Sequence, residues 1–556
     1  MKTRRPTAHR YSGPPPVELP DRAWPGRTIQ ASPRWLSTDL RDGNQSLATP
    51  MAPARKLAMF ELLVDLGYKE IEVGFPVASQ DDHDFLRLLI EQDKIPDDVR
   101  ISVLVPARDE LIRRTVESLA GVRRATIHLY NATSPLFREV VFGVGRDECR
   151  NIAVQGTRMM MKYAEQSLGQ CDLGYQYSPE LFNETELEFA LEVCEAVMDS
   201  WEPGPGRPII LNFPATVERA MPNVFADQIE WLDRNLSRRE HVCLSIHPHN
   251  DRGTGVASAE LALLAGAERI EGCLFGNGER AGNVCLVTLG MNMLTHGIDP
   301  GIDFSDINAI RRTVEYCNEM PVHPRHPYGG DLVYTSFSGS HQDAIKKGFH
   351  AIEQAAAESG DAVRDLPWRM PYLPLDPEDV GRTYEAVVRI NSQSGKGGIA
   401  YVMSSRYGLN LPRGLQIEFA QVVQAAAEAD GGELVPARVA QLFEQEYLSD
   451  VGLALGDESV STSLYVDGGG FEIGGARADA IRTIGAMLAP WGVDVRMVHR
   501  TGLSGEGKAA VYAECRMDGR TLWGAGLGVD VEIAAFAAIG SAVGRARRTL
   551  PLTAAS

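Results

Sequence analysis

The chain has 556 residues, of which 44% are hydrophobic and 23% are charged, as in an ordinary globular protein. No apolar run approaches the roughly 20 residues of a membrane-spanning helix, so no membrane partner is expected. The formal net charge of −19 argues against nucleic acid as a partner, because proteins that bind it present a basic face. An anionic substrate would have to be held by local groups, since the overall field repels it.

Residues 1–34 are predicted to form an N-terminal arm that is poorly ordered or lies along the surface. Its first residues are basic and then proline-rich, without the apolar segment of a secretory signal. The eight cysteines of the chain are scattered and none lies in a Cys-x-x-Cys pair. This pattern indicates reduced thiols in the cytoplasm and argues against a zinc–thiolate site.

Residues 35–322 alternate short apolar runs with stretches of helical spacing, which is typical of parallel strands joined by helices. Eight strands are predicted, at 35–40, 70–74, 101–105, 125–130, 172–178, 209–213, 242–247 and 269–275. Helices are predicted between several of them, at 54–66, 109–119, 185–198 and 256–264. Polar motifs follow six of these strands. That distribution favours a (β/α)8 TIM barrel, which gathers site residues from all round its rim, over an open doubly wound sheet with one switch point.

Two further regions follow the predicted barrel. A proline- and glycine-rich connector opens residues 323–429, which are predicted to form helical linker subdomains with helices at 340–358, 380–389 and 415–427. Residues 430–556 are predicted to form a small α/β domain for regulation or dimerisation. Its strands are expected at 462–466, 493–498, 509–516 and 523–531, and its helices at 478–488 and 533–545.

His247 and His249 end the seventh predicted strand, where alternation directs residues i and i+2 to the same side. Two imidazoles placed in this way can grip one divalent metal ion, although a pair of structural histidines would have the same spacing. Asp42, after the first strand, is a candidate third ligand, and the always-charged Arg41 beside it could stabilise developing negative charge. Such a set of nitrogen and oxygen ligands does not select between Mg, Mn and Zn.

A metal held by three protein ligands keeps open positions, which the ketone and carboxylate oxygens of a 2-oxo acid could fill. The ion would then act as a Lewis acid on the ketone. After the eighth strand, the glycine-rich string GNGERAGN offers Glu279 and Asn283, which could orient the ligands of the metal or a water bound to it. The string also fits a plain turn, and its place on the predicted rim is what makes it a candidate.

Together the strings RDGNQ, HPHNDRGTG and GNGERAGN resemble the 2-isopropylmalate synthase family, in its longer form typical of actinobacteria. The family belongs to a metal-dependent superfamily of condensing barrels. The resemblance continues through HLYNATSPLFREVVFG, YSPELF, PATVE, SGSHQDAIKKG and NSQSGKGGIAYVM, and so covers nearly the whole chain.

The resemblance implies roles for individual residues. Asp42, His247 and His249 would ligate the metal, with Asn283 close to it. Arg41 would contact the ketone of the 2-oxo acid, in a pocket lined by His128, Ser178 and Thr216. Glu180 and Glu279 would lie near the reacting groups. The family also implies a homodimer in which the linker region of one subunit places His341 and Tyr372 over the barrel of its partner.

The implied reaction condenses acetyl-CoA with 3-methyl-2-oxobutanoate and water to give 2-isopropylmalate and CoA, the first committed step of leucine biosynthesis. The base that removes a proton from the acetyl methyl group is either His341 or Glu180. Two alternatives are a related synthase that uses another 2-oxo acid and a non-catalytic homologue that senses a metabolite.

The chain departs from the family's pattern at a few places. Val105 and Pro106 stand where Thr-Gln is commoner, and Phe213 stands where leucine is commoner, so the oxo-acid pocket is predicted to differ. Leucine is a possible effector of the C-terminal domain. However, the glycine-rich stretch 468–476 only partly matches the regulatory turn of the family.

Overall fold

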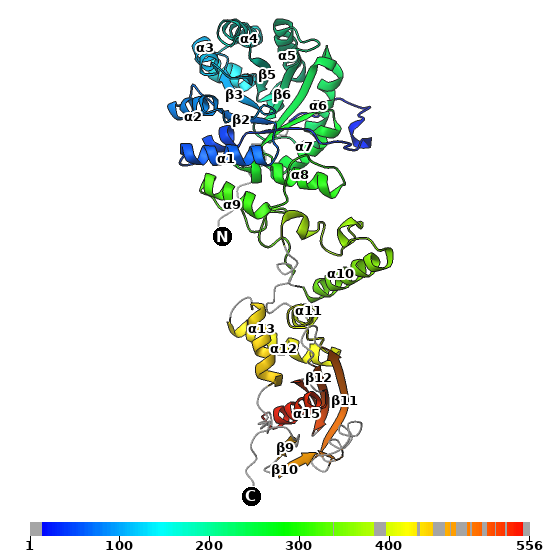
Figure 1. Ribbon diagram of the computed structural model, residues 1–556. Helices are drawn as coiled ribbons and strands as arrows, with labels where there is room; N and C mark the ends of the chain where they lie inside the picture. The colour runs from blue at the N-terminus through cyan, green and yellow to red at the C-terminus, as the bar shows by residue number, and fades with distance from the viewer. Residues whose placement is uncertain are drawn as a thin grey trace, which may run out of the picture. The chain divides into compact units, whose positions relative to one another are not determined.

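The structure is a computed structural model, and it describes residues 14–336, 338–382, 396–430, 434–448, 462–466, 469–473, 486, 488, 489, 492–502, 509–517, 519–528 and 531–548. The chain divides into two compact units (Figure 1). One comprises Met1–Val333 and Glu378–Arg382, and the other comprises Tyr334–Pro377 and Thr383–Ser556. The domain boundaries expected at 322/323 and 429/430 stay predictions.

The first unit is built on a closed barrel of eight parallel strands in the order β1 to β8. The strands are β1 (Arg34–Ser37), β2 (Glu70–Gly74), β3 (Arg100–Pro106), β4 (Arg124–Ala132), β5 (Asp172–Glu180), β6 (Ile209–Ala215), β7 (Val242–Pro248) and β8 (Arg269–Gly272). The barrel prediction is therefore confirmed for all eight strands, and the open sheet is wrong. Every residue of β2, β6, β7 and β8 is buried, because helices cover the outside and side chains fill the inside.

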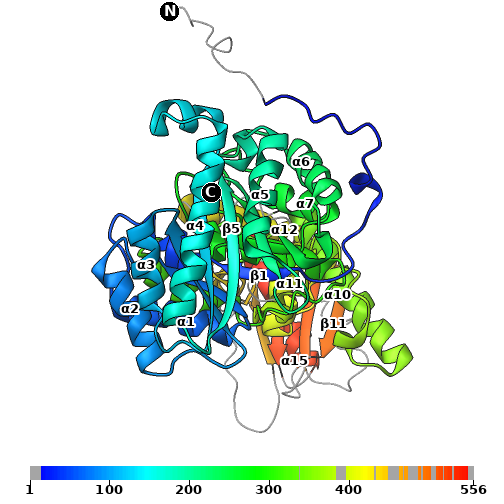
Figure 2. The same ribbon diagram turned by 90° about the horizontal axis from the view of Figure 1, so that it is seen from above.

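Helices surround the strands, and Figure 2 shows α1 to α7 around the barrel. They are α1 (Pro53–Asp65), α2 (Gln80–Glu91), α3 (Asp109–Ser118), α4 (Arg146–Ser167), α5 (Leu187–Trp201), α6 (Pro222–Asn235), α7 (Gly255–Leu264), α8 (Leu286–Thr295) and α9 (Ile307–Asn318). The four helices predicted in this region correspond to α1, α3, α5 and α7. Proline in the first turn fits the starts of α1 and α6, where its missing N–H has no partner to lose.

Two predicted strands are shorter than expected, and both differences shape the site. After Ser37 the chain leaves β1 and enters a π-helical turn, Asp39–Gly43, and after Gly272 it leaves β8 for a 3-10 turn, Leu274–Gly276. The buried Asp39 carboxylate joins the two turns by accepting the N–H of Leu274 at 3.0 Å. This bond fixes Arg41 and Asp42 against the loop that follows β8.

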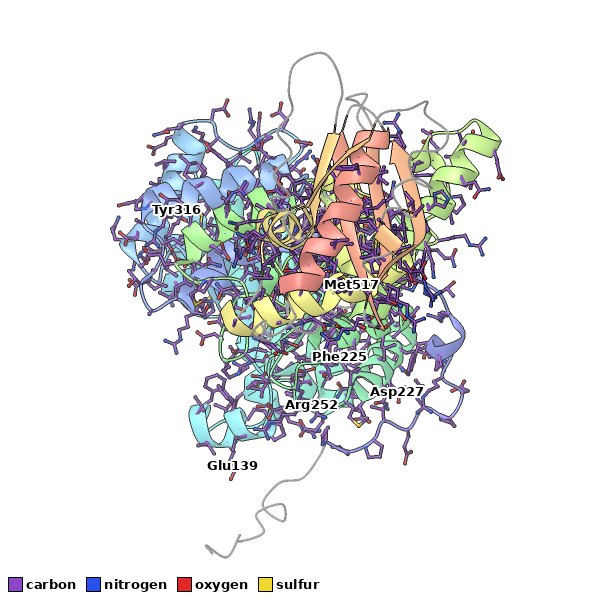
Figure 3. All side chains as sticks on the ribbon, turned by 90° about the horizontal axis from the view of Figure 1, so that it is seen from below. Glu139, Phe225, Asp227, Arg252, Tyr316 and Met517 are labelled. Carbon is purple, nitrogen blue, oxygen red and sulfur yellow. The ribbon has the colours of Figure 1, made fainter. Side chains whose placement is uncertain are left out.

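The described part of the N-terminal arm, residues 14–34, lies along the surface and is anchored to α6. Arg22 makes two hydrogen bonds to Asp227, at 2.8 and 2.9 Å, and Trp24 Nε1 donates to the same carboxylate at 2.8 Å. Figure 3 labels Asp227 on the side of α6 next to the arm. Of the two forms predicted for the arm, these residues adopt the one that lies along the surface. Residues 1–13 lie outside the described part.

The second unit contains α10 (Gly339–Ser359), α11 (Lys396–Tyr407), α12 (Arg413–Asp430), α13 (Pro436–Phe443) and α15 (Val531–Arg548). Its strands are β9 (Thr462–Val466), β10 (Gly469–Ile473), β11 (Val493–Gly502), β12 (Ala509–Met517) and β13 (Arg520–Gly528). Strands β11, β12 and β13 form an antiparallel sheet. Residues of α11, α12 and α13 share one apolar core with this sheet, and α15 contributes to a second core with it.

Most predicted elements of this unit are confirmed, with small shifts of their ends. Strand β10 was missed, because glycine-rich Gly469–Ile473 carries little strand propensity of its own and pairs with β9 as a hairpin. The predicted helix 380–389 begins next to a short 3-10 turn, Pro377–Val380, and its residues 383–389 lie outside the described part. Most of the predicted helix 478–488 lies outside it too. Among the described residues, no helix combines the length and apolar character needed to cross a membrane.

Candidate metal centre and substrate pocket

A cavity of about 310 Å³ lies at the carboxyl ends of the barrel strands. Nine predicted site residues are among those that line it, namely Arg41, Asp42, His128, Ser178, Glu180, Thr216, His247, His249 and Glu279. They come from segments that follow or end β1, β4, β5, β6, β7 and β8. The structure brings these residues together in one cavity at one end of the barrel. The roles of the individual residues stay predictions.

Three buried groups converge within the cavity. The Oδ2 atom of Asp42 lies 3.4 Å from Nε2 of His247 and 3.6 Å from Nε2 of His249, and ligand atoms of the three residues lie within 4.8 Å of one another. Asn283 lies beside them, with its Oδ1 atom 2.7 Å from Nε2 of His247. Two imidazole nitrogens and a carboxylate oxygen suit a divalent ion such as Zn²⁺ or Mn²⁺.

The three groups differ in their protonation. Burial lowers the pKa of His249 to about 4, with help from the neighbouring His247, so this imidazole is neutral and able to ligate. Burial also lowers the pKa of His247, but hydrogen bonds to Asp42 and Glu271 outweigh it and raise the value to about 9. Burial would raise the pKa of Asp42, yet Arg41 and His247 hold it below its usual range. Asp42 therefore stays ionised and His249 neutral, whereas a metal ion would displace the proton that His247 carries.

His247 is held from behind by a buried polar network on the barrel floor. Its Nδ1 atom lies 2.9 Å from the Oε2 atom of Glu271, which leaves Nε2 facing Asp42. Gln176 and Arg269 both donate to Oε1 of Glu271 at 2.6 Å, and Arg269 also donates to Glu70 at 2.8 Å. By contrast, Nδ1 of His249 has no hydrogen-bond partner in the described part of the chain, although it is buried. A hydrogen bond to Nδ1 thus orients His247, whereas His249 has no such bond within the described residues.

A second buried network orients Arg41. Its Nε atom donates to Glu72 Oε1 at 2.5 Å, and Glu72 Oε2 lies 2.8 Å from Nδ1 of His128. Nε2 of His128 lies 2.7 Å from Oγ of Ser178, which accepts a hydrogen bond from Asn212 at 2.9 Å. Three predicted pocket residues and two unpredicted ones therefore form one chain of contacts across the cavity.

Comparisons with known proteins agree with this geometry. Residues 32–314 match the HMGL-like family, and residues 331–404 match the alpha-isopropylmalate synthase, post-catalytic domain-like family. The 2-isopropylmalate synthase of Streptosporangium roseum is 74% identical over 98% of this chain and 96% of its own. The chain belongs to the 2-isopropylmalate synthase family. Enzymes of the same name from Thermobifida fusca and a Parafrankia species are 60% and 56% identical, and each comparison covers 97% of this chain, with 98% and 97% of those enzymes.

Thr216 and Glu180 both line the cavity, on neighbouring segments that follow β6 and end β5. The Thr216 hydroxyl accepts the N–H of Leu181 at 3.0 Å, and Leu181 has a left-handed φ of 61°. Burial raises the pKa of Glu180, while Arg41 opposes the shift. Arg280, which sequence analysis did not single out, donates to the backbone oxygen of Thr216 and to Asp251. It ties the GNGERAGN loop to the pocket wall.

The departures from the family's pattern touch the pocket less directly than expected. On β3 it is Leu104 that lines the cavity, while Val105 is fully buried and neither it nor Pro106 is a lining residue. On β6, Asn212 and Pro214 line the cavity, and Phe213 packs against Phe182 with ring centroids 4.9 Å apart. The alternation of strand side chains explains why Val105 and Phe213 face away from the cavity.

His341 and Tyr372 belong to the second unit, whereas all residues that line the cavity belong to the first. The two rings stack with their centroids 3.9 Å apart and an angle of 23° between their planes. Tyr372 is 60% exposed and has a left-handed φ of 62°, which is costly for a bulky residue. An exposed, strained aromatic residue of this kind is typical of a functional contact.

The sequence motifs did not point to Glu72, Asn212, Glu271 or Arg280. Each of the first three lies inside an apolar strand, at Glu-Ile-Glu-Val, Ile-Leu-Asn-Phe and Arg-Ile-Glu-Gly. A charged or amide residue within a buried strand needs a partner, and that signal could have identified them.

The floor network generates a prediction about metal affinity. Glu271→Gln removes the charge that holds His247 Nδ1, so we expect a loss of roughly 10–100-fold in metal affinity with the fold retained. Calorimetric titration of metal into the apo-protein measures this directly. Glu268→Gln is the matched control, because Glu268 lies next to the start of the same strand, is half exposed and pairs with Arg239. Equal affinity of Glu271→Gln and the wild type would contradict the assignment.

Proposed function

We propose that this chain condenses acetyl-CoA with 3-methyl-2-oxobutanoate and water to give 2-isopropylmalate and CoA. The observation that carries the proposal is the 74% identity, along nearly all of both chains, to the 2-isopropylmalate synthase of S. roseum. The cavity supports it, because it gathers the metal-ligating and anion-binding side chains that such a reaction needs. In this account the enzyme performs the first committed step of leucine biosynthesis.

Asp42, His247 and His249 would hold the divalent ion, with Asn283 beside them. When bound, the ion supplies Lewis acidity to the ketone of the oxo acid. The Arg41 guanidinium, held by Glu72 at 2.5 Å, faces the same space and stabilises the alkoxide that forms at the attacked carbon. His128, Ser178 and Thr216 orient the oxo acid through polar contacts.

A base must remove a proton from the acetyl methyl group before carbon–carbon bond formation. His341 is one candidate, since an imidazole titrates near neutral pH. Glu180 is the other, because its raised pKa brings a pocket carboxylate closer to the working pH. After condensation, water cleaves the thioester, which releases CoA and makes the overall reaction irreversible.

The proposal includes a homodimer in which the linker region of each subunit reaches the barrel of its partner. The stacked His341 and Tyr372 would then complete the partner's site.

We also propose the cytoplasm as the location, because the described structure contains eight free cysteines and no disulfide among them. Inhibition by leucine stays a prediction, since residues 468 and 474–476 of the candidate turn lie outside the described part.

Substrate choice is tested by measuring thiol release from acetyl-CoA with a panel of 2-oxo acids in metal-replete enzyme. We expect kcat/KM for 3-methyl-2-oxobutanoate to exceed that for pyruvate and 2-oxobutanoate by about tenfold or more, since a missing methyl group in an apolar pocket has an effect of that size. It should also exceed that for 2-oxoglutarate, whose second carboxylate is a further charge to bury. A preference for another oxo acid would favour the related-synthase alternative. No thiol release with any of them would favour the non-catalytic homologue.

The crossing of subunits is tested by complementation. Differently tagged Arg41→Ala and His341→Ala chains are co-expressed, and the mixed dimer is isolated through both tags. Each parent should be almost inactive, whereas the mixed dimer should regain about half of wild-type activity, because one of its two sites carries neither change.

A mixed dimer of Arg41→Ala with Asp42→Ala is the matched control. Both changes lie in the same barrel segment, so each of its two sites keeps one defect and no activity should return. If the first mixed dimer is as inactive as this control, His341 acts within its own chain.

A further inference from the structure

The proline- and glycine-rich connector that follows α9, residues 323–331, folds back onto the barrel. Its turn is closed by the N–H of Gly330, which donates to the carbonyl of His326 at 2.9 Å. The connector lies against the base of the loop at 276–283, which carries Glu279 and Asn283. The proposed reaction assigns no role to the connector, so its contacts with this loop call for an explanation.

The loop at 276–283 follows β8 and is closed at its base. The N–H of Asn283 donates to the carbonyl of Gly276 at 3.1 Å, which brings the two arms of the loop together. Phe275 lies on the arm that enters the loop, and Cys285 lies on the arm that leaves it. The position of these two arms therefore fixes the position of Asn283.

The imidazole of His326 contacts both arms. It meets the ring of Phe275 edge-on, with centroids 5.2 Å apart and an angle of 71° between the planes. Its Nε2 atom lies 3.4 Å from Sγ of Cys285, and its Nδ1 atom lies 2.9 Å from the carbonyl oxygen of Pro327. Because a carbonyl oxygen only accepts, Nδ1 carries the ring proton and Nε2 accepts from the thiol of Cys285.

The ionisation of the two groups agrees with this direction of the hydrogen bond. Burial raises the pKa of the Cys285 thiol to about 11, so the thiol keeps its proton. Burial lowers the pKa of His326, so its ring is neutral near pH 7. The N–H and the hydroxyl of Thr288 donate to the sulfur at 3.2 and 3.1 Å. A donor therefore meets an acceptor at every step from Thr288 to the connector.

A second segment holds the backbone of the connector in place. The buried guanidinium of Arg382 donates to the carbonyls of Gly329 and Gly330 at 2.7 and 2.8 Å. Gly329 approaches Phe275 so closely that a Cβ atom there would lie 2.5 Å from the ring, so only glycine fits. Arg382 ends the short segment Glu378–Arg382, which belongs to the first unit.

We infer that His326 is a positioning residue for the metal centre, because it holds both arms of the loop that carries Asn283 and Glu279. The inference rests on the proposed function and adds a residue to it. Asn283 Oδ1 lies 2.7 Å from Nε2 of His247, so a shift of the loop alters this contact directly. Arg382 contributes by fixing the connector from which His326 projects.

Calorimetric titration of Mn²⁺ into the full-length apo-protein tests the inference, together with the visible absorption spectrum of the Co²⁺-loaded protein. His326→Ala should raise the Kd for Mn²⁺ about tenfold, as is typical when a residue that orients a metal site is lost. It should also change the Co²⁺ spectrum, which reports the geometry of the ligands. His326→Gln should recover most of both properties, because an amide can still donate and accept.

His323→Ala is the matched control. His323 belongs to the same connector, is exposed, and accepts the N–H of Arg325 at 3.1 Å within the connector itself. Its replacement should leave the Kd for Mn²⁺ and the Co²⁺ spectrum unchanged. If His326→Ala lowers the Tm but leaves both of these readouts at their wild-type values, the role of His326 is structural and the inference is wrong.

A double-mutant cycle with Cys285→Ala tests the contact itself. If the two residues act through one hydrogen bond, the double variant should bind Mn²⁺ about as weakly as the weaker single variant. Additive losses would contradict the shared contact. Cys285→Ala removes the same hydrogen bond from the other side, so a wild-type Kd in this variant overturns the inference even if His326→Ala fails to fold.

The proposed function and this inference fail in different ways. If the protein turns over no oxo acid, the proposed function is wrong, and the Mn²⁺ titration still decides whether His326 positions the metal centre. Wild-type protein that binds neither Mn²⁺ nor Co²⁺ would overturn the metal centre and this inference with it.

Discussion

The pairing of β1 with β8 closes the barrel, and the whole candidate site depends on it. Residues Arg34–Ser37 of β1 align with Arg269–Gly272 of β8, which brings the start of the domain against its end. Only this closure places Asp42 within 3.4 Å of His247, which lies 205 residues further along the chain. The Asp39 carboxylate, which accepts the Leu274 N–H, then fixes the turn that carries Asp42. The candidate metal centre therefore depends on the pairing of β1 with β8.

Closure of the barrel also buries several charged side chains close together, and each of them is paired with an opposite charge. Glu72 and Glu271 are both fully buried, and burial alone would make their ionised forms costly. Arg41 offsets the first and His247 with Arg269 offset the second, so the pKa of each carboxyl stays below its usual range, at about 2 for Glu72. Because every partner is shared, removal of one group leaves another buried charge without compensation. The site is thus held rigid by electrostatics as well as by packing.

The eight strands could be predicted because each is a short apolar run, and the site's rim followed from the polar motifs at their ends. The ends of β1 and β8 could not, because the turns Asp39–Gly43 and Leu274–Gly276 depend on a hydrogen bond between distant segments. The residues behind the site were missed for a similar reason. The contacts of Glu271 with His247 and of Asn212 with Ser178 form only when neighbouring strands pair, so the sequence alone does not reveal them.

Pocket shape was the weakest expectation drawn from sequence. Val105, Pro106 and Phe213 were expected to alter the wall, yet the residues of β3 and β6 that line it are Leu104, Asn212 and Pro214. A change of residue on a strand predicts altered substrate specificity only when it is known whether that side chain points into the pocket. The same limit applies to β10, whose glycines become a strand only through pairing with β9.

The central claim is that Asp42, His247 and His249 bind one divalent ion. Diffraction from crystals of the metal-loaded protein, recorded above and below the absorption edge of the ion, tests it most directly. The account predicts one anomalous peak at roughly 2.0–2.3 Å from a carboxylate oxygen of Asp42 and from Nε2 of each histidine. A peak that lacks either histidine as a ligand, or that lies elsewhere in the barrel, would contradict the account.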